Sequence, residues 1–161
     1  MVGIVTGPMN SGKTTRMKAL QRKLGGDGFV MLKTMDGNQV KSYHAQRLST
    51  GEKRLLVLRK GYSHDKFSEK TRIGPYRFDE LTLNWVHTTM KQLIRNETTP
   101  LFLDEVGNLE LCGEGFDATV KILKEARGTL YITVRTDLVD RVKRAYSLKN
   151  VRIIKGDEFN G

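Results

Sequence analysis

The residue types best suited to chemistry gather near the start of the chain, in the segment GPMNSGKTT. This segment has the spacing G-x-x-x-x-G-K-[ST], in which glycines let backbone N–H groups turn inward around phosphate oxygens. Lys13 is expected to reach the β- and γ-phosphates of a nucleotide, and the hydroxyl of Thr14 to hold Mg²⁺. The residues at the fixed places of the motif are Gly7, Gly12, Lys13 and Thr14.

The flanking segments supply the strand and the helix that a phosphate-binding loop needs. Residues 2–5 form an apolar run that predicts a buried strand. Residues 16–24 predict a helix, whose start adds N–H donors and the positive end of its dipole. We therefore predict nucleotide binding by the whole loop, which consists of Gly7, Pro8, Met9, Asn10, Ser11, Gly12, Lys13, Thr14 and Thr15.

A second motif lies far along the chain, where the apolar residues 101–103 end at Asp104 and Glu105. Because the carboxyl ends of parallel strands meet at one edge of a sheet, Asp104 is expected beside Thr14, where it would support Mg²⁺. Glu105 would then face the γ-phosphate and deprotonate a water. The sequence indicates no pocket for another acceptor, so the pair predicts hydrolysis. The competing interpretation is a surface turn that Gly107 continues.

Two arginines are candidates for stabilising charge in the transition state. Arg135 and Thr133 stand at the end of the next predicted strand, where a polar group would touch the γ-phosphate or the attacking water. Arg72 lies in a polar stretch, residues 60–73, that predicts an exposed loop. Each arginine is also explained by a solvated surface charge, which is the commonest role of this residue type.

The composition favours a folded α/β protein. The 161 residues have the size of one domain, so we expect a single domain over residues 1–161. No apolar stretch approaches the ~20 residues of a membrane helix, and no leader-like segment precedes the first strand. We therefore expect a cytoplasmic protein with no membrane contact.

A single cysteine, Cys112, excludes an internal disulfide, and the histidines are too scattered for a metal site.

The net charge of +10 favours anionic partners. A triphosphate accounts for part of it, and nucleic acid is the natural further candidate. Against nucleic acid, the basic residues are spread thinly and only 7% of the residues are aromatic. The sequence does not indicate the preferred base or the oligomeric state, and a neighbouring subunit would be a further source of an arginine.

Strands alternate with helices along the chain, which predicts an α/β fold with a mainly parallel sheet and helices on both faces. Residues 40–58 predict an added antiparallel hairpin, and residues 25–28 a flexible turn. A helix that follows Asp79 and Glu80 and runs to about Arg95 is expected to bury Leu81, Trp85, Leu93 and Ile94. The other predicted strands are residues 29–32, 76–78, 130–134 and 151–154, and the other helices are residues 116–126 and 137–146.

Together these motifs resemble the small thermophile-type nucleoside-triphosphatases, the family of the cancer-related nucleoside-triphosphatase. The likeness spans the chain in order, from the phosphate loop through Arg72-Ile73-Gly74 to DEVGNLEL, where the family pattern is D-E-I-G-x-M-E-L. It implies a P-loop NTPase with a RecA-like sheet and Mg²⁺-dependent hydrolysis of ATP, GTP and other triphosphates. By position, Asp104 and Glu105 match the family's metal-supporting and water-activating pair.

The chain departs from the family pattern in two places. The loop carries Met9-Asn10 where the family usually has Pro-Gly in the middle, and asparagine tolerates the positive φ that glycine adopts. Residues 28–33 keep only the opening of the family's G-F-Y-T-x-E-x-R strand. Two other functions share the phosphate loop: a P-loop nucleoside or nucleotide kinase with an acceptor pocket, and a nucleotide-gated nucleic-acid-binding ATPase.

Overall fold

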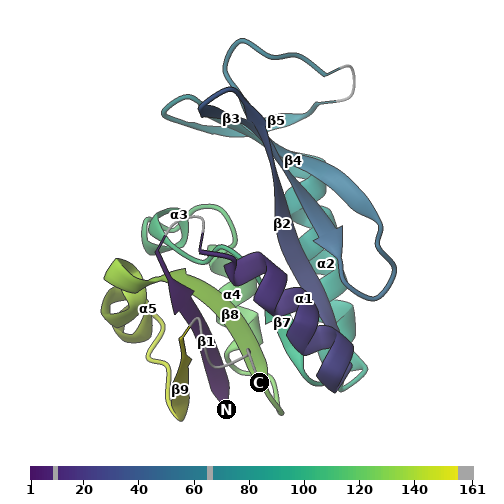
Figure 1. Ribbon diagram of the computed structural model, residues 1–161. Coiled ribbons are helices and arrows are strands. Elements are labelled where there is room, and N and C mark those ends of the chain that lie inside the picture. Colours follow the sequence, from purple (N-terminus) through teal and green to yellow (C-terminus); the bar gives the residue numbers. More distant parts are fainter. Residues whose placement is uncertain (9–10, 65–66, 156–161) are drawn as a thin grey trace.

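The computed structural model describes residues 1–8, 11–64 and 67–155. Within these residues the strands form one nine-stranded sheet in the order β5-β6-β4-β3-β2-β7-β8-β1-β9 (Figure 1). The strands are β1 (Val2–Gly7), β2 (Asp27–Asp36), β3 (Gln39–Arg47), β4 (Lys53–Arg59), β5 (Glu69–Ile73), β6 (Tyr76–Asp79), β7 (Leu101–Leu103), β8 (Leu130–Arg135) and β9 (Val151–Ile154).

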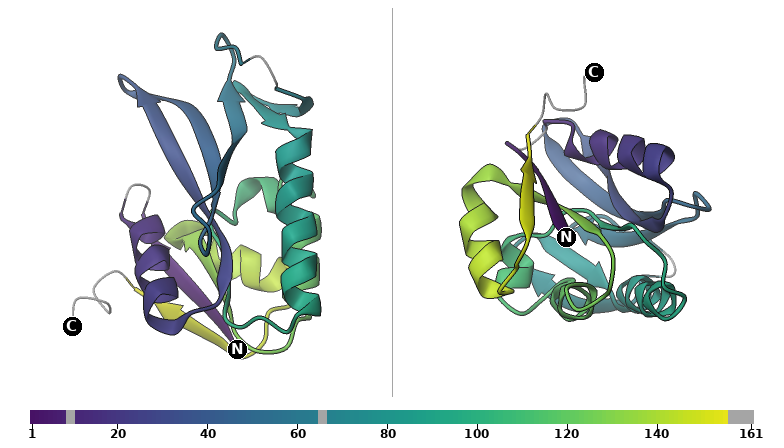
Figure 2. Two further views of the ribbon diagram at one scale, coloured as in Figure 1. Left: turned by 90° about the vertical axis from the view of Figure 1, so that its right-hand side faces the viewer. Right: turned by 90° about the horizontal axis from the view of Figure 1, so that it is seen from below.

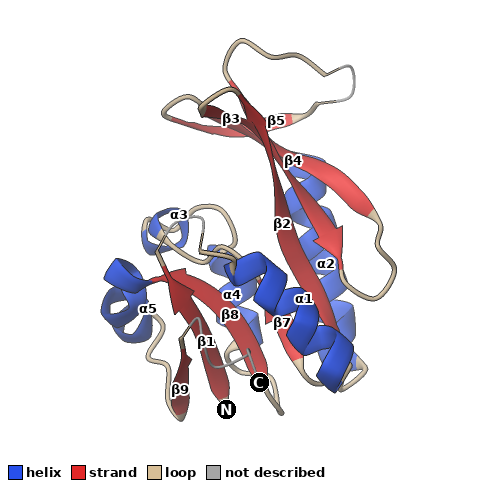
Figure 3. Cartoon of the chain, in the orientation of Figure 1, coloured by secondary structure: helices blue, strands red, loops and turns tan. Residues whose placement is uncertain are grey.

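Helices cover both faces of the parallel part of the sheet. The view from below in Figure 2 shows α1 on one face and α2, α4 and α5 on the other, and Figure 3 shows the same layers coloured by secondary structure. The helices are α1 (Lys13–Leu24), α2 (Glu80–Arg95), α3 (Asn108–Leu111), α4 (Asp117–Leu123) and α5 (Val139–Ala145), with a short 3₁₀ turn η1 (Thr136–Leu138) before α5.

The core is divided by the sheet into two apolar clusters. Because successive side chains of a strand point to opposite faces, Ile4 packs on the α2 side and Val5 on the α1 side. The same alternation places Leu103 and Phe102 on opposite sides. Both clusters exclude water, so the carboxyl ends of these strands are held rigidly at one edge.

The predicted α/β arrangement is confirmed. Strands β2, β7, β8, β1 and β9 pair in parallel, and the connections between them carry the helices. The predicted hairpin is also present, as β3 and β4. The carboxyl ends of β1, β7 and β8 therefore meet at one edge, as the placement of the two motifs requires.

The antiparallel part is larger than a hairpin. The sheet continues past β2 through β3, β4, β6 and β5, and this region projects beyond the parallel part (Figure 1). We call these four strands, together with the end of β2 that pairs with β3 beyond β7, the projecting sheet. The stretch of residues 60–73 is not wholly a loop, because Glu69–Ile73 forms β5. This edge strand is stabilised by pairing with β6, so its sequence needs no apolar run.

The predicted turn of residues 25–28 is wrong in its second half, because β2 begins at Asp27. The buried carboxylate of Asp27 accepts hydrogen bonds from Ser49 and Arg47 and so fixes the loop after β3. Gly28 adopts a φ of 154°, and a Cβ at this position would lie 2.0 Å from the carbonyl oxygen of Phe102. Glycine is therefore required for β2 to approach β7.

The predicted buried face of helix α2 is confirmed at Leu93, is partly confirmed at Trp85 and Ile94, and is wrong at Leu81. Asp79 begins the helix by accepting a hydrogen bond from the backbone N–H of Thr82. Leu81 is 64% exposed, and Trp85 is partly buried with its ring edge against Phe29. The fully packed positions are Val86, Met90 and Leu93, together with Thr82. Among the described residues, no helix is long and apolar enough to cross a membrane.

Candidate functional site

The phosphate loop connects β1 to α1, as the motif predicted. Gly12 stands directly before the helix with a φ of 83°, a conformation that glycine adopts without strain. The Nζ of Lys13 donates hydrogen bonds to the carbonyl oxygens of Gly7 at 3.2 Å and Pro8 at 2.8 Å. Thr15 is exposed in the first turn of α1. Two of the predicted loop residues, Met9 and Asn10, lie outside the described residues.

Lys13 is held in a tight environment. Its side chain crosses the loop, and the residue is only 8% exposed. Loss of water around the ammonium lowers its pKa, and the negative charges of Glu105 and Asp104 oppose this shift. The lysine therefore faces both acidic residues of the second motif from across the site.

Asp104 joins the phosphate loop to the sheet. It is 0% exposed, and its Oδ2 accepts hydrogen bonds from the hydroxyl of Thr14 at 2.6 Å and from the backbone N–H of Met31 at 3.0 Å. Its Oδ1 accepts the hydroxyl proton of Thr133 at 2.5 Å. Both oxygens are thus engaged within the protein, and a buried carboxylate with several donors is well compensated.

Glu105 is placed by its own backbone. Its φ of 63° lies in the left-handed region, which costs a non-glycine residue about 1–2 kcal/mol. Its N–H donates to the hydroxyl oxygen of Thr133 at 2.8 Å, and this bond holds the unusual conformation. Glu105 lines a cavity at this edge of the sheet. Strain of this kind at a carboxylate is typical of functional sites.

The surroundings of Glu105 shift its pKa upward from the ordinary value of 4.5, although the residue is exposed at the cavity. The cavity walls displace water from the carboxylate and raise its pKa, and the nearby charge of Asp104 raises it further. Lys13, Lys33 and Arg135 act in the opposite direction. A carboxylate with a raised pKa beside a phosphate loop is suited to accept a proton.

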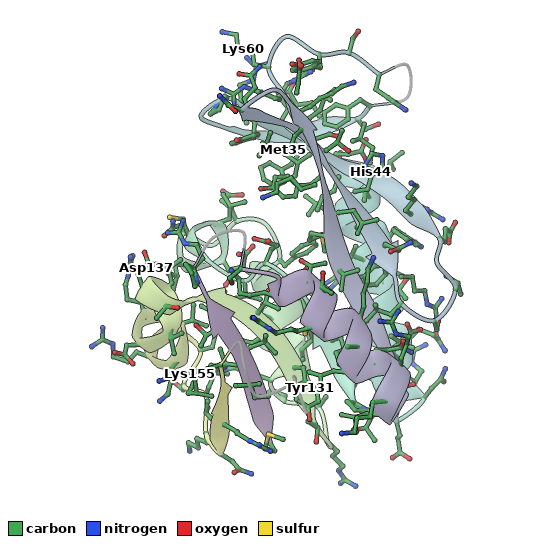
Figure 4. All side chains as sticks on the ribbon, viewed as in Figure 1. Met35, His44, Lys60, Tyr131, Asp137 and Lys155 are labelled. Atoms are coloured by element: carbon green, nitrogen blue, oxygen red, sulfur yellow. The ribbon has the colours of Figure 1, made fainter. Side chains whose placement is uncertain are left out.

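The two candidate arginines are placed differently. Arg135 ends β8 next to Gly7, lines the cavity, and donates a 3.2 Å hydrogen bond to Asp137, which Figure 4 labels. Arg72 lies on β5 at the edge of the projecting sheet, exposed and paired with Glu69 at 3.0 Å. The structure therefore brings Arg135 to the site and leaves Arg72 away from it.

Three buried polar atoms around the loop lack a hydrogen-bond partner within the described part of the chain. They are the Oγ of Ser11, the Nη1 of Arg16 and the Nε of Arg135. Buried polar atoms are almost always paired, so unpaired ones need an explanation. A phosphate oxygen would supply an acceptor to each. Arg16 carries no motif signal of its own, because an arginine on the first turn of a helix is common.

A cavity of about 290 Å³ opens beside Glu105, between the projecting sheet and the segment that contains α3. Its polar end is formed by Lys13, Glu105, Thr133 and Arg135. The remaining walls are mainly apolar and aromatic, and they come from segments far apart in the sequence. The members of these walls include Tyr43, Tyr76, Phe78, Leu83, Leu109 and Phe116. The sequence indicated no such pocket, because these residues come from separate segments and the only one in a quoted motif, Leu109, has an apolar side chain with no chemistry of its own.

The segment after Glu105 is held by a second buried acid, Glu110. One carboxylate oxygen accepts the N–H of Gly107 at 2.7 Å and the other accepts the N–H of Phe116 at 2.9 Å. Gly115 passes so close that a Cβ there would lie 2.3 Å from Glu110 Oε2. Glu110 therefore closes residues 107–116 into one wall of the cavity.

Replacing Glu110 with glutamine is expected to change how stability depends on pH. Burial raises the pKa of Glu110 from 4.5 to about 7, so the folded state binds a proton more tightly than the unfolded state. Wild-type stability relative to Glu110→Gln should be highest below pH 4.5 and should fall as the pH rises to about 7. The decline is on the order of 3 kcal/mol.

Urea unfolding of both proteins at several pH values between 4 and 8 measures this difference. A difference between the two proteins that is independent of pH would show that folding leaves the pKa of Glu110 unchanged.

The comparisons with known proteins agree on one group. The family model described as NTPase matches residues 3–160. The solution structure of a human cancer-related nucleoside triphosphatase is 22% identical, covering 94% of this chain and 86% of that one with a TM-score of 0.63. The crystal structure of THEP1 from the hyperthermophile Aquifex aeolicus is 19% identical, covering 96% and 89%, with a TM-score of 0.64. No curated protein matches the chain.

Proposed function

Because this chain belongs to the NTPase family and is an NTPase enzyme, we propose that it hydrolyses ATP, GTP and other nucleoside triphosphates with Mg²⁺, using Glu105 to activate water. The observation that carries this proposal is the position of Glu105. The hydroxyl of Thr133 accepts a hydrogen bond from the backbone N–H of Glu105 and donates one to the carboxylate of Asp104. The same carboxylate accepts a hydrogen bond from the hydroxyl of Thr14 in the phosphate loop. These bonds join the backbone of Glu105 to the phosphate loop, which supports the role proposed for its side chain.

The proposed reaction is an in-line displacement at the γ-phosphorus. The oxygen of water forms a bond to phosphorus while the bond to the bridging β–γ oxygen breaks, and the diphosphate leaves with the electron pair. Glu105 accepts the proton of the water, and Lys13 and Arg135 offset the charge on the phosphate oxygens. Catalysis of this kind depends mainly on positioning and charge, which the buried hydrogen bonds of Asp104 supply.

The residues present suit a Mg²⁺ ion. Mg²⁺ prefers oxygen ligands and keeps several waters, so it needs few protein groups. The Thr14 hydroxyl donates its proton to Asp104 at 2.6 Å, which leaves its oxygen lone pairs for the ion. Both carboxylate oxygens of Asp104 already accept hydrogen bonds, so Asp104 would support the ion indirectly, by orienting the Thr14 hydroxyl. When bound, the ion would neutralise charge on the β- and γ-phosphates.

Removing divalent metal is expected to lower phosphate release to the background rate. Excess EDTA is added to the enzyme with ATP, GTP, CTP or UTP, free phosphate is measured, and Mg²⁺ is then restored. Far-UV circular dichroism should stay unchanged, because the bond between Thr14 and Asp104 forms without the ion. Full activity in EDTA would refute the role of the metal. A lack of phosphate release from all four nucleotides with Mg²⁺ would refute the proposed function.

Because the net charge of +10 favours nucleic acid as a partner, the phosphate-release assay is also run with nucleic acid. Phosphate release is measured with and without single-stranded DNA or RNA at low and high salt. A nucleic-acid-binding ATPase would show turnover that depends on the nucleic acid and is lost as salt rises. We expect turnover by the protein alone, because Glu105, Lys13 and Asp104 are already assembled.

A further inference from the structure

The cavity beside Glu105 is larger than one attacking water requires. Its volume is about 290 Å³, whereas a water molecule occupies about 30 Å³ of the liquid. Pockets for small organic molecules start at about 300 Å³. The cavity is therefore close to the lower limit of size for a small-molecule site.

The cavity lies on the γ-phosphate side of the nucleotide. Among the described residues of the phosphate loop, Lys13 alone lines it. A lysine at this place in the loop reaches the β- and γ-phosphates, so the sugar and base of the same nucleotide would extend away from the cavity. Whatever occupies the cavity would lie next to the γ-phosphorus, in the position of an attacking group.

The walls suit a flat, uncharged ring. Tyr43, Phe78 and Tyr76 contribute aromatic side chains from the projecting sheet, and Phe116 contributes another from the opposite segment. Aromatic side chains favour stacked or edge-to-face contacts with other rings. Figure 4 shows the projecting sheet, labelled at Met35, standing apart from the parallel part that carries Asp137, with side chains between them.

A few polar groups would recognise the edge of such a ring. Asn108 lines the cavity and carries both amide donors and an amide acceptor. Tyr43 adds a hydroxyl, and removal of water raises the pKa of this group to about 12. The cations that line the cavity are Lys13, Lys33 and Arg135, and all three act on the charge of Glu105 at the phosphate end. An acceptor with a charge of its own would find mostly apolar walls.

We propose that this cavity binds a nucleoside, and that the enzyme transfers the γ-phosphoryl group of ATP to its hydroxyl. The hydroxyl oxygen forms a bond to the γ-phosphorus while the bond to the bridging β–γ oxygen breaks, and ADP leaves with the electron pair. Glu105 accepts the hydroxyl proton. The inference rests on the proposed function, since both reactions use Lys13 and Glu105, and water competes with the nucleoside for the γ-phosphate.

The test follows the label from [γ-³²P]ATP. The full chain and Mg²⁺ are incubated with adenosine, guanosine, cytidine, uridine or thymidine, and chromatography separates free phosphate from nucleoside monophosphate. We expect label on at least one nucleoside, and none on ribose, which lacks the flat ring. Label in free phosphate alone with every nucleoside overturns the inference and leaves hydrolysis intact. Label that stays in ATP without any nucleoside refutes the proposed function instead.

Two cavity variants and one control test whether the acceptor binds in the cavity. Leu83→Trp places a large ring in the cavity from α2, whereas Leu81→Trp makes the same change at an exposed position on the same helix. The ratio of transfer to hydrolysis should fall about 100-fold in Leu83→Trp, because a misplaced acceptor reacts poorly. Leu109→Trp, from the opposite wall, should have the same effect and covers a failure of Leu83→Trp to fold. An unchanged ratio in a folded cavity variant overturns the site.

Discussion

Replacing Lys13 with alanine is expected to abolish turnover and to weaken triphosphate binding by about 100-fold. The ammonium is almost buried and is held by the carbonyls of Gly7 and Pro8, so no other group can move into its place. Loss of one partner from a buried charge pair costs about 2–5 kcal/mol. Calorimetry with a non-hydrolysable ATP analogue measures the binding, and phosphate release measures the turnover.

Lys23→Ala is the matched control for this change. Lys23 is exposed in the last turn of the same helix, so its loss changes net charge equally but leaves the loop intact. Its binding and turnover should equal those of the wild type. Turnover that survives in Lys13→Ala would place the phosphates outside this loop.

Replacing Glu105 with glutamine is expected to lower kcat by about 10²-fold or more while ATP still binds. Glutamine keeps the shape of the side chain and the N–H that donates to Thr133, but it cannot accept the proton of the attacking water. The effect matches the loss of a positioned general base. Single-turnover phosphate release measures the chemical step, and calorimetry with the ATP analogue measures the binding.

Glu97→Gln provides a control with the same backbone conformation. Glu97 is an exposed glutamate with a φ of 57°, close to the 63° of Glu105, so both changes place glutamine in the left-handed region. Phosphate release by Glu97→Gln should not change. Equal rates for Glu105→Gln and the wild type would remove Glu105 from the role of base.

The parallel part of the fold follows from the sequence because its inner strands are buried on both faces. Such strands are short apolar runs, and the predicted residues 101–103 and 130–134 agree with β7 and β8. Two solved structures with the same fold confirm the predicted class. The edge strand β5 escaped prediction because its sequence, EKTRI, has no apolar run and depends on its partner β6.

The buried stripe of α2 was only partly predictable. Helical spacing fixes which residues share a face, but the tertiary partners decide which face is buried. Leu81 matches an apolar pattern and is nevertheless exposed, while Thr82 is buried through a hydrogen bond to the carbonyl of Leu55. Nothing in residues 79–95 alone indicates that partner.

In the candidate site, the contact between Thr14 and Asp104 was predictable because it follows from two motifs and one rule about parallel strands. The roles assigned to these residues, and to Glu105, stay predictions. The cavity was not predictable, because its walls come from the projecting sheet, α2 and the α3 segment. Arg72 belongs to a motif of the family but lies beside Glu69 on β5, so its proposed catalytic role has no support from its position.

Strand β2 belongs to both parts of the sheet, and Asp104 stands where they diverge. β2 pairs with β7 only as far as Phe29, and two residues later the N–H of Met31 donates to Asp104. Beyond that point β2 continues into the projecting sheet, labelled in Figure 1. A displacement of the projecting sheet would therefore be transmitted along β2 to the hydrogen bond between Met31 and Asp104.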